Sequence, residues 1–155
     1  MDWYIVALGS NRAGPWGTPE QAVRRALGLL DAPVASRIIY TAPLGPSRRR
    51  FINAVAVVES DRAPTLLLAH LKALETDAGR RRGQRWSARP LDLDIIGWSG
   101  GIHASPGLSI PHPRFRDRRF VLAPLVQIAP DWRDPLTHCT ARQLLARLDR
   151  KRPRP

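Results

Sequence analysis

The sequence predicts an α+β fold of the ferredoxin-like type, a βαββαβ sandwich in which helices cover one face of an antiparallel sheet. Four short strand-like runs and two amphipathic helical segments follow one another in that order along the first hundred residues. The chain has 155 residues, of which 43% are hydrophobic and 25% charged, and this composition is typical of one globular domain. The C-terminal third is predicted to be an extension of the sandwich.

The first strand and the first helix are predicted near the N-terminus. Residues 3–8 form a short apolar run that includes Tyr, Ile and Val, which is typical of a buried strand. The run ends at Gly9-Ser10-Asn11, whose residue types favour a turn. Thr18, Pro19 and Gln21 then form a capping box with proline at the first helical position, so a helix is expected to begin at Pro19.

Two more strands are predicted before the second helix. Residues 37–41 are rich in β-branched side chains and are followed by Pro43 and Gly45, which break a strand. Residues 51–59 alternate between two faces that are both mostly apolar, so this strand is predicted to be central. One of its faces carries Phe51, Asn53, Val55 and Val57.

The second helix and the fourth strand complete the predicted sandwich. The helix is expected to begin at Pro64 and to end before Gly79, which stands where a left-handed cap residue is common. The fourth strand is predicted over residues 91–96, with its end at Gly97. The apolar stripe of the helix consists of Leu67, Leu71, Leu74 and Ala78.

The C-terminal extension is predicted to contain two helices. One covers residues 116–128 and is interrupted at Pro124, and a short final helix is capped by Thr140. Residues 1–148 are expected to form a single domain, whereas the basic tail, residues 149–155, is expected to be disordered and receives no function.

The formal net charge of +12 favours anionic partners such as phosphates, nucleic acids or lipid head groups. GC-rich coding produces the same arginine enrichment irrespective of function, so the total charge leaves both explanations open. The arginines also cluster beside turn residues, at 48–50, 80–89 and 114–119. A single cysteine, Cys139, excludes an internal disulfide, and no apolar run reaches the roughly 18 residues of a membrane span. We expect a soluble cytoplasmic protein.

Two carboxylates on the fourth strand are the most informative feature. Asp92 and Asp94 are two residues apart, so they share one face of the strand while Leu91, Leu93 and Ile95 point into the core. Like charges at this spacing repel one another unless a cation lies between them, and carboxylate pairs often hold magnesium against phosphate oxygens. The alternative is an edge strand with a solvated polar face.

An arginine-rich segment precedes the carboxylates. It carries Arg80, Arg82, Arg85 and Arg89, with Trp86 among them, between the second helix and the fourth strand. Such a segment suits a polyphosphate whose charge is shared between arginines and a metal ion, although a solvated basic loop is the simpler explanation. Near its start, Glu75 lies at the margin of the apolar stripe, where an acidic side chain opposes the helix dipole, and this favours a ligand-binding role.

A set of specific motifs occurs in order along nearly the whole chain. The most specific are Arg89-Pro90-Leu91-Asp92-Leu93-Asp94-Ile95 and Ile110-Pro111-His112-Pro113-Arg114. The others are Ala7-Leu8-Gly9-Ser10-Asn11, Phe51-Ile52-Asn53-Ala54-Val55, Glu75 with Gly79-Arg80-Arg81-Arg82, Arg85-Trp86, Phe120-Val121-Leu122-Ala123-Pro124-Leu125 and Ile128-Ala129-Pro130. Together these motifs strongly resemble the 6-hydroxymethyl-7,8-dihydropterin pyrophosphokinases (HPPK) of folate biosynthesis.

The resemblance implies transfer of the diphosphate of ATP to the hydroxymethyl group of 6-hydroxymethyl-7,8-dihydropterin, with release of AMP. Asp92 and Asp94 would hold two magnesium ions, and Arg80 and Arg89 would be catalytic. The implied ATP ligands are Glu75, Arg82, Trp86, Ile95, His112 and Arg118. The implied pterin ligands are Thr41, Pro43, Leu44, Phe51, Asn53 and Phe120.

The chain departs from the family pattern at several positions. Ser87-Ala88 replaces the usual Gly-Pro, Arg48-Arg49-Arg50 stands where Gln and Asp are common, and Lys72 replaces a Gln. A weakened paralogue or an inactive scaffold of the same family is therefore an alternative. An RNA-binding domain shares the same element order, but the first strand lacks the central aromatic side chain that such domains use. We expect a monomer that binds neither nucleic acid nor membranes.

Overall fold

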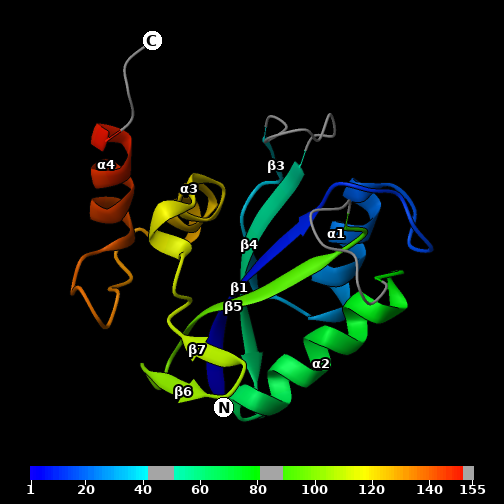
Figure 1. Cartoon of the computed structure of the whole chain (residues 1–155), viewed down its shortest axis with the longest axis horizontal. Helices are drawn as coiled ribbons and strands as arrows, with labels where there is room; N and C mark the ends of the chain where they lie inside the picture. Colours follow the sequence, from blue (N-terminus) through cyan, green and yellow to red (C-terminus); the bar gives the residue numbers. More distant parts are fainter. Residues whose placement is uncertain (42–50, 81–88, 152–155) are drawn as a thin grey trace.

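The structure is a computed structural model and describes residues 1–41, 51–80 and 89–151 (Figure 1). Within these residues one sheet has the strand order β2-β4-β1-β5, with β3 also pairing with β4, and all neighbouring strands are antiparallel. This arrangement confirms the predicted ferredoxin-like sandwich. The strands are β1 (Asp2–Ser10), β2 (Val34–Ala35), β3 (Ile39–Thr41), β4 (Phe51–Ser60) and β5 (Asp92–Trp98).

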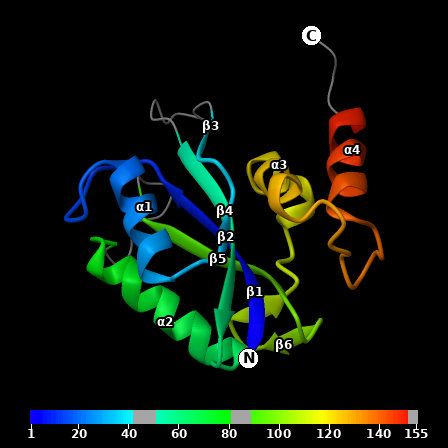
Figure 2. The same ribbon diagram turned by 180° about the vertical axis from the view of Figure 1, so that it is seen from behind.

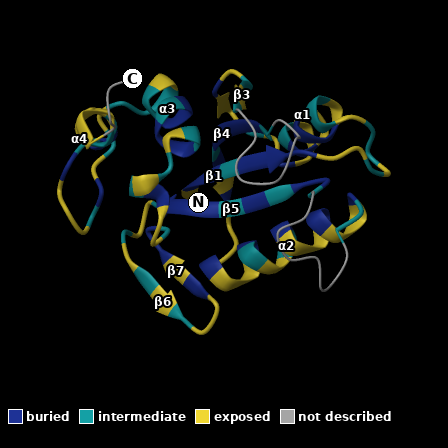
Figure 3. Ribbon diagram, turned by 45° about the horizontal axis from the view of Figure 1, so that its top comes forward, coloured by how far each residue is buried: buried dark blue, intermediate teal, exposed yellow. Residues whose placement is uncertain are grey.

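Helices lie on both faces of this sheet (Figures 1 and 2). α1 (Pro19–Leu29) and α2 (Pro64–Asp77) cover one face, as predicted, and pack on Val6, Leu8 and Leu93. The C-terminal helices α3 (Arg119–Ile128) and α4 (Ala141–Lys151) lie on the other side and enclose a second apolar cluster. The central strands β1 and β4 are mostly buried between the helices, whereas β2 and β3 are exposed or intermediate (Figure 3). The prediction of helices on one face holds for α1 and α2.

Two strand predictions need correction. The strand expected at residues 37–41 forms only over Ile39–Thr41 (β3), and a short strand that was not predicted, β2 (Val34–Ala35), comes before it. Ser36, directly after β2, bonds Val55 of β4 through both its backbone amide and its hydroxyl group. β5 does not end at Gly97 but continues to Trp98. Gly97 is needed for space, since a Cβ atom there would lie 2.8 Å from the Trp132 ring.

The C-terminal third also differs from the prediction. Arg116 belongs to a short 3-10 helix, η1 (Phe115–Asp117), and α3 then runs through Pro124 without a break. Burial of the α3 side chains compensates for the hydrogen bond that the proline removes. α4 continues to Lys151, so residues 149–151 of the expected tail are helical. The hairpin of β6 (His103–Ser105) and β7 (Leu108–Ile110) was not predicted.

None of the helices in residues 1–41, 51–80 and 89–151 has the length and apolar character needed to cross a membrane.

The α1 prediction is confirmed in detail. Thr18 Oγ1 accepts from the Gln21 amide, and the Gln21 side chain accepts from the Thr18 amide, so the capping box is complete. This local sequence signal fixes where the helix begins.

A glycine substitution tests the junction after α2. Gly79 has φ +109°, and a Cβ atom there would lie 2.6 Å from Pro15 Cδ. We expect Gly79→Ala to lower the free energy of unfolding by about 1–3 kcal/mol, because it adds backbone strain and a clash. Gly28→Ala is the matched control: it lies in α1 with open space around it and should raise stability by about 0.5–1 kcal/mol. Urea unfolding followed by circular dichroism measures the free energy of unfolding of both variants. Equal changes would contradict the strain and close contact assigned to Gly79.

Candidate active site

The two carboxylates of β5 lie at the floor of a cleft. Asp92 pairs in register with Gly9 and Asp94 with Ala7, both on β1. The small β1 residues leave the space above the carboxylates open. Leu93, between the two aspartates, is completely buried on the opposite face of the sheet under the helices. The same-face prediction for the aspartates is therefore confirmed.

The cleft has a volume of about 460 Å³ and opens between the sheet and the segment that enters α3. Its lining comes from β1, β3, β4, β5 and residues 112–121, so segments far apart in the sequence meet there. The predicted site residues that line it are Thr41, Phe51, Asn53, Arg89, Asp92, Asp94, His112, Arg118 and Phe120. Ala7, Leu8, Gly9 and Val121 also line it and were not predicted to be site residues.

Several predicted residues lie elsewhere. Ile95 is buried in the core below α1 and α2, on the side of the sheet away from the cleft. Glu75 and the predicted catalytic residue Arg80 are also absent from the cleft lining. Arg82, Trp86, Pro43 and Leu44 lie outside the described residues, as do the departures at Arg48-Arg49-Arg50 and Ser87-Ala88.

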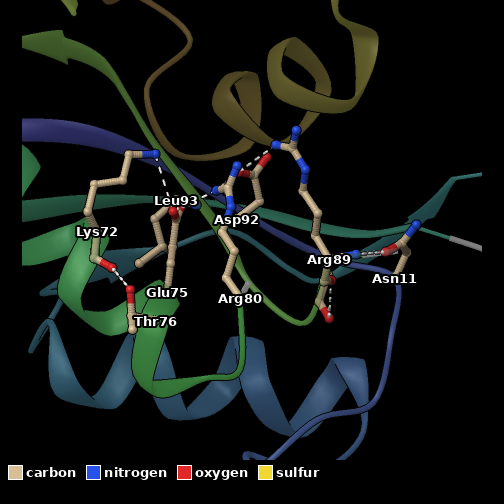
Figure 4. A network of polar contacts seen from close by, with 9 residues as sticks. Asn11, Lys72, Glu75, Thr76, Arg80, Arg89, Asp92 and Leu93 are labelled. Atoms are coloured by element: carbon tan, nitrogen blue, oxygen red, sulfur yellow. Dashed lines mark hydrogen bonds and ion pairs between the residues drawn. The ribbon is translucent and has the colours of Figure 1, made fainter. Parts of the chain in front are cut away.

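Asp92 forms ion pairs with both predicted catalytic arginines (Figure 4). Its Oδ1 atom accepts from Arg80 Nη1 at 3.1 Å and from Arg89 Nη1 at 3.1 Å. Asp94 has a different environment. Burial raises the pKa of Asp94, and the charge of Asp92 adds to this, whereas His112 and other cationic neighbours lower it. The pair therefore provides one neutralised carboxylate and one that favours a proton or a cation.

Glu75 is built into the framework of the site rather than free to meet a ligand. Its side chain is 1% exposed and accepts from the Leu93 amide at 2.7 Å, from Arg80 Nη1 at 2.6 Å and from Lys72 Nζ at 3.2 Å (Figure 4). Burial raises the pKa of Glu75, while these three donors act in the opposite direction. Glu75 thus links α2 to β5 and holds Arg80 next to Asp92.

Ser10 and Asn11 anchor the chain where it enters β5, a role that sequence reasoning missed. Asn11 Oδ1 accepts from the Arg89 amide at 2.5 Å, and the Asn11 amide donates to the Arg89 carbonyl at 3.0 Å. Ser10 Oγ donates to the Pro90 carbonyl at 2.7 Å. Both side chains are buried. A Ser-Asn pair directly after a buried strand was interpreted only as a turn, although buried polar groups require partners.

His112 lines the cleft, and the backbone of its own segment occupies one of its ring nitrogens. Its amide donates to the Ile96 carbonyl at 3.0 Å, and its Nδ1 atom accepts from the Arg114 amide at 3.0 Å. Burial lowers the pKa of His112, although the charge of Asp94 opposes this. In the neutral ring the proton is therefore on Nε2, which leaves Nε2–H as a hydrogen-bond donor for a ligand.

The part of the cleft lining formed by β3, β4 and α3 carries an amide and two aromatic rings. Asn53 is 6% exposed, and its Nδ2 atom donates to Thr41 Oγ1 at 3.0 Å. A Cβ atom at Gly9 would lie 3.2 Å from Asn53 Oδ1, so the glycine gives this amide room. Phe51 and Phe120 line the same cleft from β4 and α3. This part of the cleft suits a flat, polar heterocycle.

The donor set also fits a magnesium ion. In the described part of the chain, no three His, Cys, Asp or Glu side chains come together as a metal site. Magnesium, however, is usually held by only one or two carboxylates, with substrate phosphates and water as its other ligands. Asp92 and Asp94, beside two arginines that can bind phosphate, meet this requirement.

Comparison with known proteins agrees with this geometry. The family model for 7,8-dihydro-6-hydroxymethylpterin-pyrophosphokinase (HPPK) matches residues 5–130. The 2-amino-4-hydroxy-6-hydroxymethyldihydropteridine pyrophosphokinase of Pseudomonas aeruginosa is 39% identical over 137 residues, which cover 84% of this chain and 82% of that protein. The protein of the same name from Synechocystis is 40% identical over 148 residues, or 94% of this chain and 75% of that protein.

A solved structure shows the same fold at low identity. The Plasmodium falciparum HPPK-DHPS crystallised with pteroate superposes with a TM-score of 0.69 at 15% identity. The match covers 94% of this chain but only 42% of that one. From the family match and the identities to two bacterial relatives, we conclude that this chain belongs to the 7,8-dihydro-6-hydroxymethylpterin-pyrophosphokinase family.

Proposed function

We propose that the chain catalyses its family's reaction in the cleft above β5, namely transfer of the diphosphate of ATP to the hydroxymethyl group of 6-hydroxymethyl-7,8-dihydropterin in folate biosynthesis. The hydroxymethyl oxygen bonds to the β-phosphorus and releases its proton, the bond from this phosphorus to the α,β-bridging oxygen breaks, and AMP leaves. One observation carries the proposal: Asp92 and Asp94 line a single cleft together with arginines and two aromatic rings.

The phosphate end of the cleft is the side of Asp92 and Asp94. These carboxylates would hold two magnesium ions, which when bound neutralise charge on the triphosphate. Arg80 and Arg89 share Asp92 Oδ1. Asp92 can bind a metal only when these two arginines release it. We infer that both guanidinium groups then bind phosphate oxygens, which are also bidentate partners for arginine. Arg118 also lines the cleft, with its guanidinium 5.7 Å from the centre of the Phe120 ring, and would bind the phosphates too.

The pterin end is formed by Phe51, Phe120 and Asn53. We infer that the two rings stack on the faces of the heterocycle, each adding about 0.5–1.5 kcal/mol beyond area burial. The Asn53 amide offers both a donor and an acceptor to the pterin edge. Thr41 orients this amide through its hydroxyl group. The remaining predicted pterin ligands, Pro43 and Leu44, belong to residues outside the described ranges.

His112 provides a test of the phosphate end. We expect His112→Ala to raise the Kd for magnesium-ATP about 10- to 100-fold, because a hydrogen bond to a charged phosphate is lost. His112→Gln, whose amide can donate in place of Nε2–H, should recover part of this loss. Burial lowers the His112 pKa, so the ring does not lose a proton between pH 7 and 8. The affinity of the wild type for magnesium-ATP should therefore not fall over this range on account of His112. Calorimetric titration measures all three, and an unchanged Kd in His112→Ala would exclude this contact.

The proposed function is tested by a turnover assay in which ATP, hydroxymethyl-dihydropterin and magnesium are omitted in turn. We expect AMP only when all three are present. A nucleic-acid-binding module would instead bind RNA with an affinity that falls steeply with salt, at a log-log slope of about −0.7 to −0.9 per contacted phosphate. Submicromolar RNA binding without pterin-dependent AMP would favour that alternative. A monomeric state and a cytoplasmic location remain predictions.

A further inference from the structure

A buried ion pair lies outside the cleft, in the C-terminal extension. Asp134 is completely buried in the loop between α3 and α4. Its Oδ2 accepts from Arg116 Nε at 2.5 Å and from Thr137 Oγ1 at 2.7 Å, and its Oδ1 accepts from Arg116 Nη2 at 2.8 Å and from the Leu136 amide at 3.0 Å. Although burial acts in the opposite direction, these hydrogen bonds lower the pKa of Asp134 to about 2.

Arg116 lies on the segment that carries two cleft residues. It belongs to η1, between His112 and Arg118, both of which line the cleft. The Arg116 guanidinium lies 4.7 Å from the centre of the Phe115 ring, and Phe115 packs edge-to-face on Trp132 at 5.7 Å. The Arg118 amide donates to the Phe115 carbonyl at 3.2 Å, so the backbone of η1 continues directly into Arg118.

The Asp134 loop is well held without Arg116. The Asp134 amide donates to the Cys139 carbonyl at 2.9 Å, and the His138 amide donates to the Asp134 carbonyl at 2.8 Å. α4 is attached to the second apolar cluster through Ala141 and Leu144, which are buried. The Asp134 carboxylate therefore has a fixed position, and its two hydrogen bonds with the Arg116 guanidinium hold η1 in place.

We propose that Asp134 is a positioning residue for ATP binding: by fixing Arg116, it sets where the Arg118 guanidinium lies relative to Asp92 and Asp94. This inference rests on the proposed function of Arg118 as a phosphate ligand. A displacement of about 1 Å at such a contact can cost up to a hundredfold in rate, even when its cause lies far from the chemistry. The remote carboxylate thus contributes to affinity without touching the nucleotide.

The test is a double-mutant cycle between Asp134→Asn and Arg118→Ala. Asn has the same shape, but its NH₂ group cannot accept the hydrogen bonds that Arg116 and Thr137 donate. The readout is the Kd for the magnesium complex of a non-hydrolysable ATP analogue, measured by calorimetry. We expect Asp134→Asn to raise this Kd about tenfold in the wild-type background and less than about twofold in the Arg118→Ala background.

The control variant is Asp149→Ala. It removes a different Asp–Arg pair, in which Asp149 of α4 contacts the half-exposed Arg119 of α3 at 3.1 Å. We expect it to leave the Kd unchanged. Arg116→Lys keeps the charge but cannot bind both oxygens, so it repeats the test if Asp134→Asn does not fold. An equal rise in both backgrounds, or no rise in either, would overturn the proposal. The proposed function itself is decided separately, by pterin-dependent AMP formation in the wild-type protein.

Discussion

Replacement of either Asp92 or Asp94 by alanine is expected to reduce turnover by at least about a hundredfold while the protein stays folded. The two carboxylates face the cleft from one strand, and we propose that together they hold the metal ions that neutralise the triphosphate. Loss of a group that stabilises charge in the transition state typically costs 10²- to 10³-fold in rate. Steady-state AMP formation at saturating ATP, pterin and magnesium measures the effect.

Turnover is expected to fall when Asp94 is replaced, but the free energy of unfolding is expected to rise. Burial and the charge of Asp92 raise the pKa of Asp94, so the folded protein binds this proton more tightly than the unfolded chain. The stability contribution of Asp94 is therefore fully present below its unfolded pKa and is lost as the pH rises through the folded value. Without magnesium, Asp94→Asn should be more stable than the wild type at neutral pH, as urea unfolding would measure.

Asp131→Ala is the matched control for the two aspartate variants. Asp131 is 81% exposed and its contact with Arg142 is long, at 3.7 Å, so its removal should alter neither turnover nor stability. Retention of more than about a tenth of wild-type turnover by Asp92→Ala or Asp94→Ala, a loss below roughly 1.4 kcal/mol, would exclude the metal-binding role.

Asn53→Ala and Phe51→Ala are expected to abolish most pterin binding and to leave ATP binding intact. Asn53 is nearly buried and faces the cleft, so its loss would leave a polar pterin edge without a partner. An unsatisfied polar group costs about 1–3 kcal/mol, which is roughly 5- to 150-fold in Kd. Phe51→Ala removes one of the two proposed stacking faces. Calorimetric titration with hydroxymethyl-dihydropterin, in the presence of a magnesium-ATP analogue, measures both losses.

Val57→Ala is the control for these two variants. It lies on the same face of β4 but outside the cleft lining, so it should leave the affinities for both ligands unchanged. The ATP affinity serves as the internal reference for correct folding. An equal loss of ATP and pterin affinity in Asn53→Ala would indicate damage to the sheet rather than a pterin contact.

The sheet and its two long helices were predictable because local physics sets them. The capping box at Thr18 and proline at the first turn mark the start of α1 irrespective of the rest of the fold. The two-residue period places Asp92 and Asp94 on one face, and Leu93 on the other. The sequence patterns of β4, with two apolar faces, also identified it correctly as a central strand.

The remainder depends on contacts between distant segments. Pro124 predicts a helix break, but burial of the surrounding α3 side chains against the sheet is the stronger effect. No local pattern pairs Arg116 with Asp134, 18 residues away, or Asn11 with Arg89, 78 residues away. The resemblance implies that Glu75 is a nucleotide ligand, and only the structure shows that Arg80, Lys72 and the Leu93 amide donate to its carboxylate.

The most direct test of the proposed function follows the phosphoryl groups of ATP. ATP labelled in its γ-phosphate is incubated with the protein, magnesium and 6-hydroxymethyl-7,8-dihydropterin, and the products are separated. Diphosphate transfer predicts a labelled pterin diphosphate and an equal amount of unlabelled AMP. Formation of ADP with a pterin monophosphate, or release of the label as free phosphate, would contradict the assigned reaction.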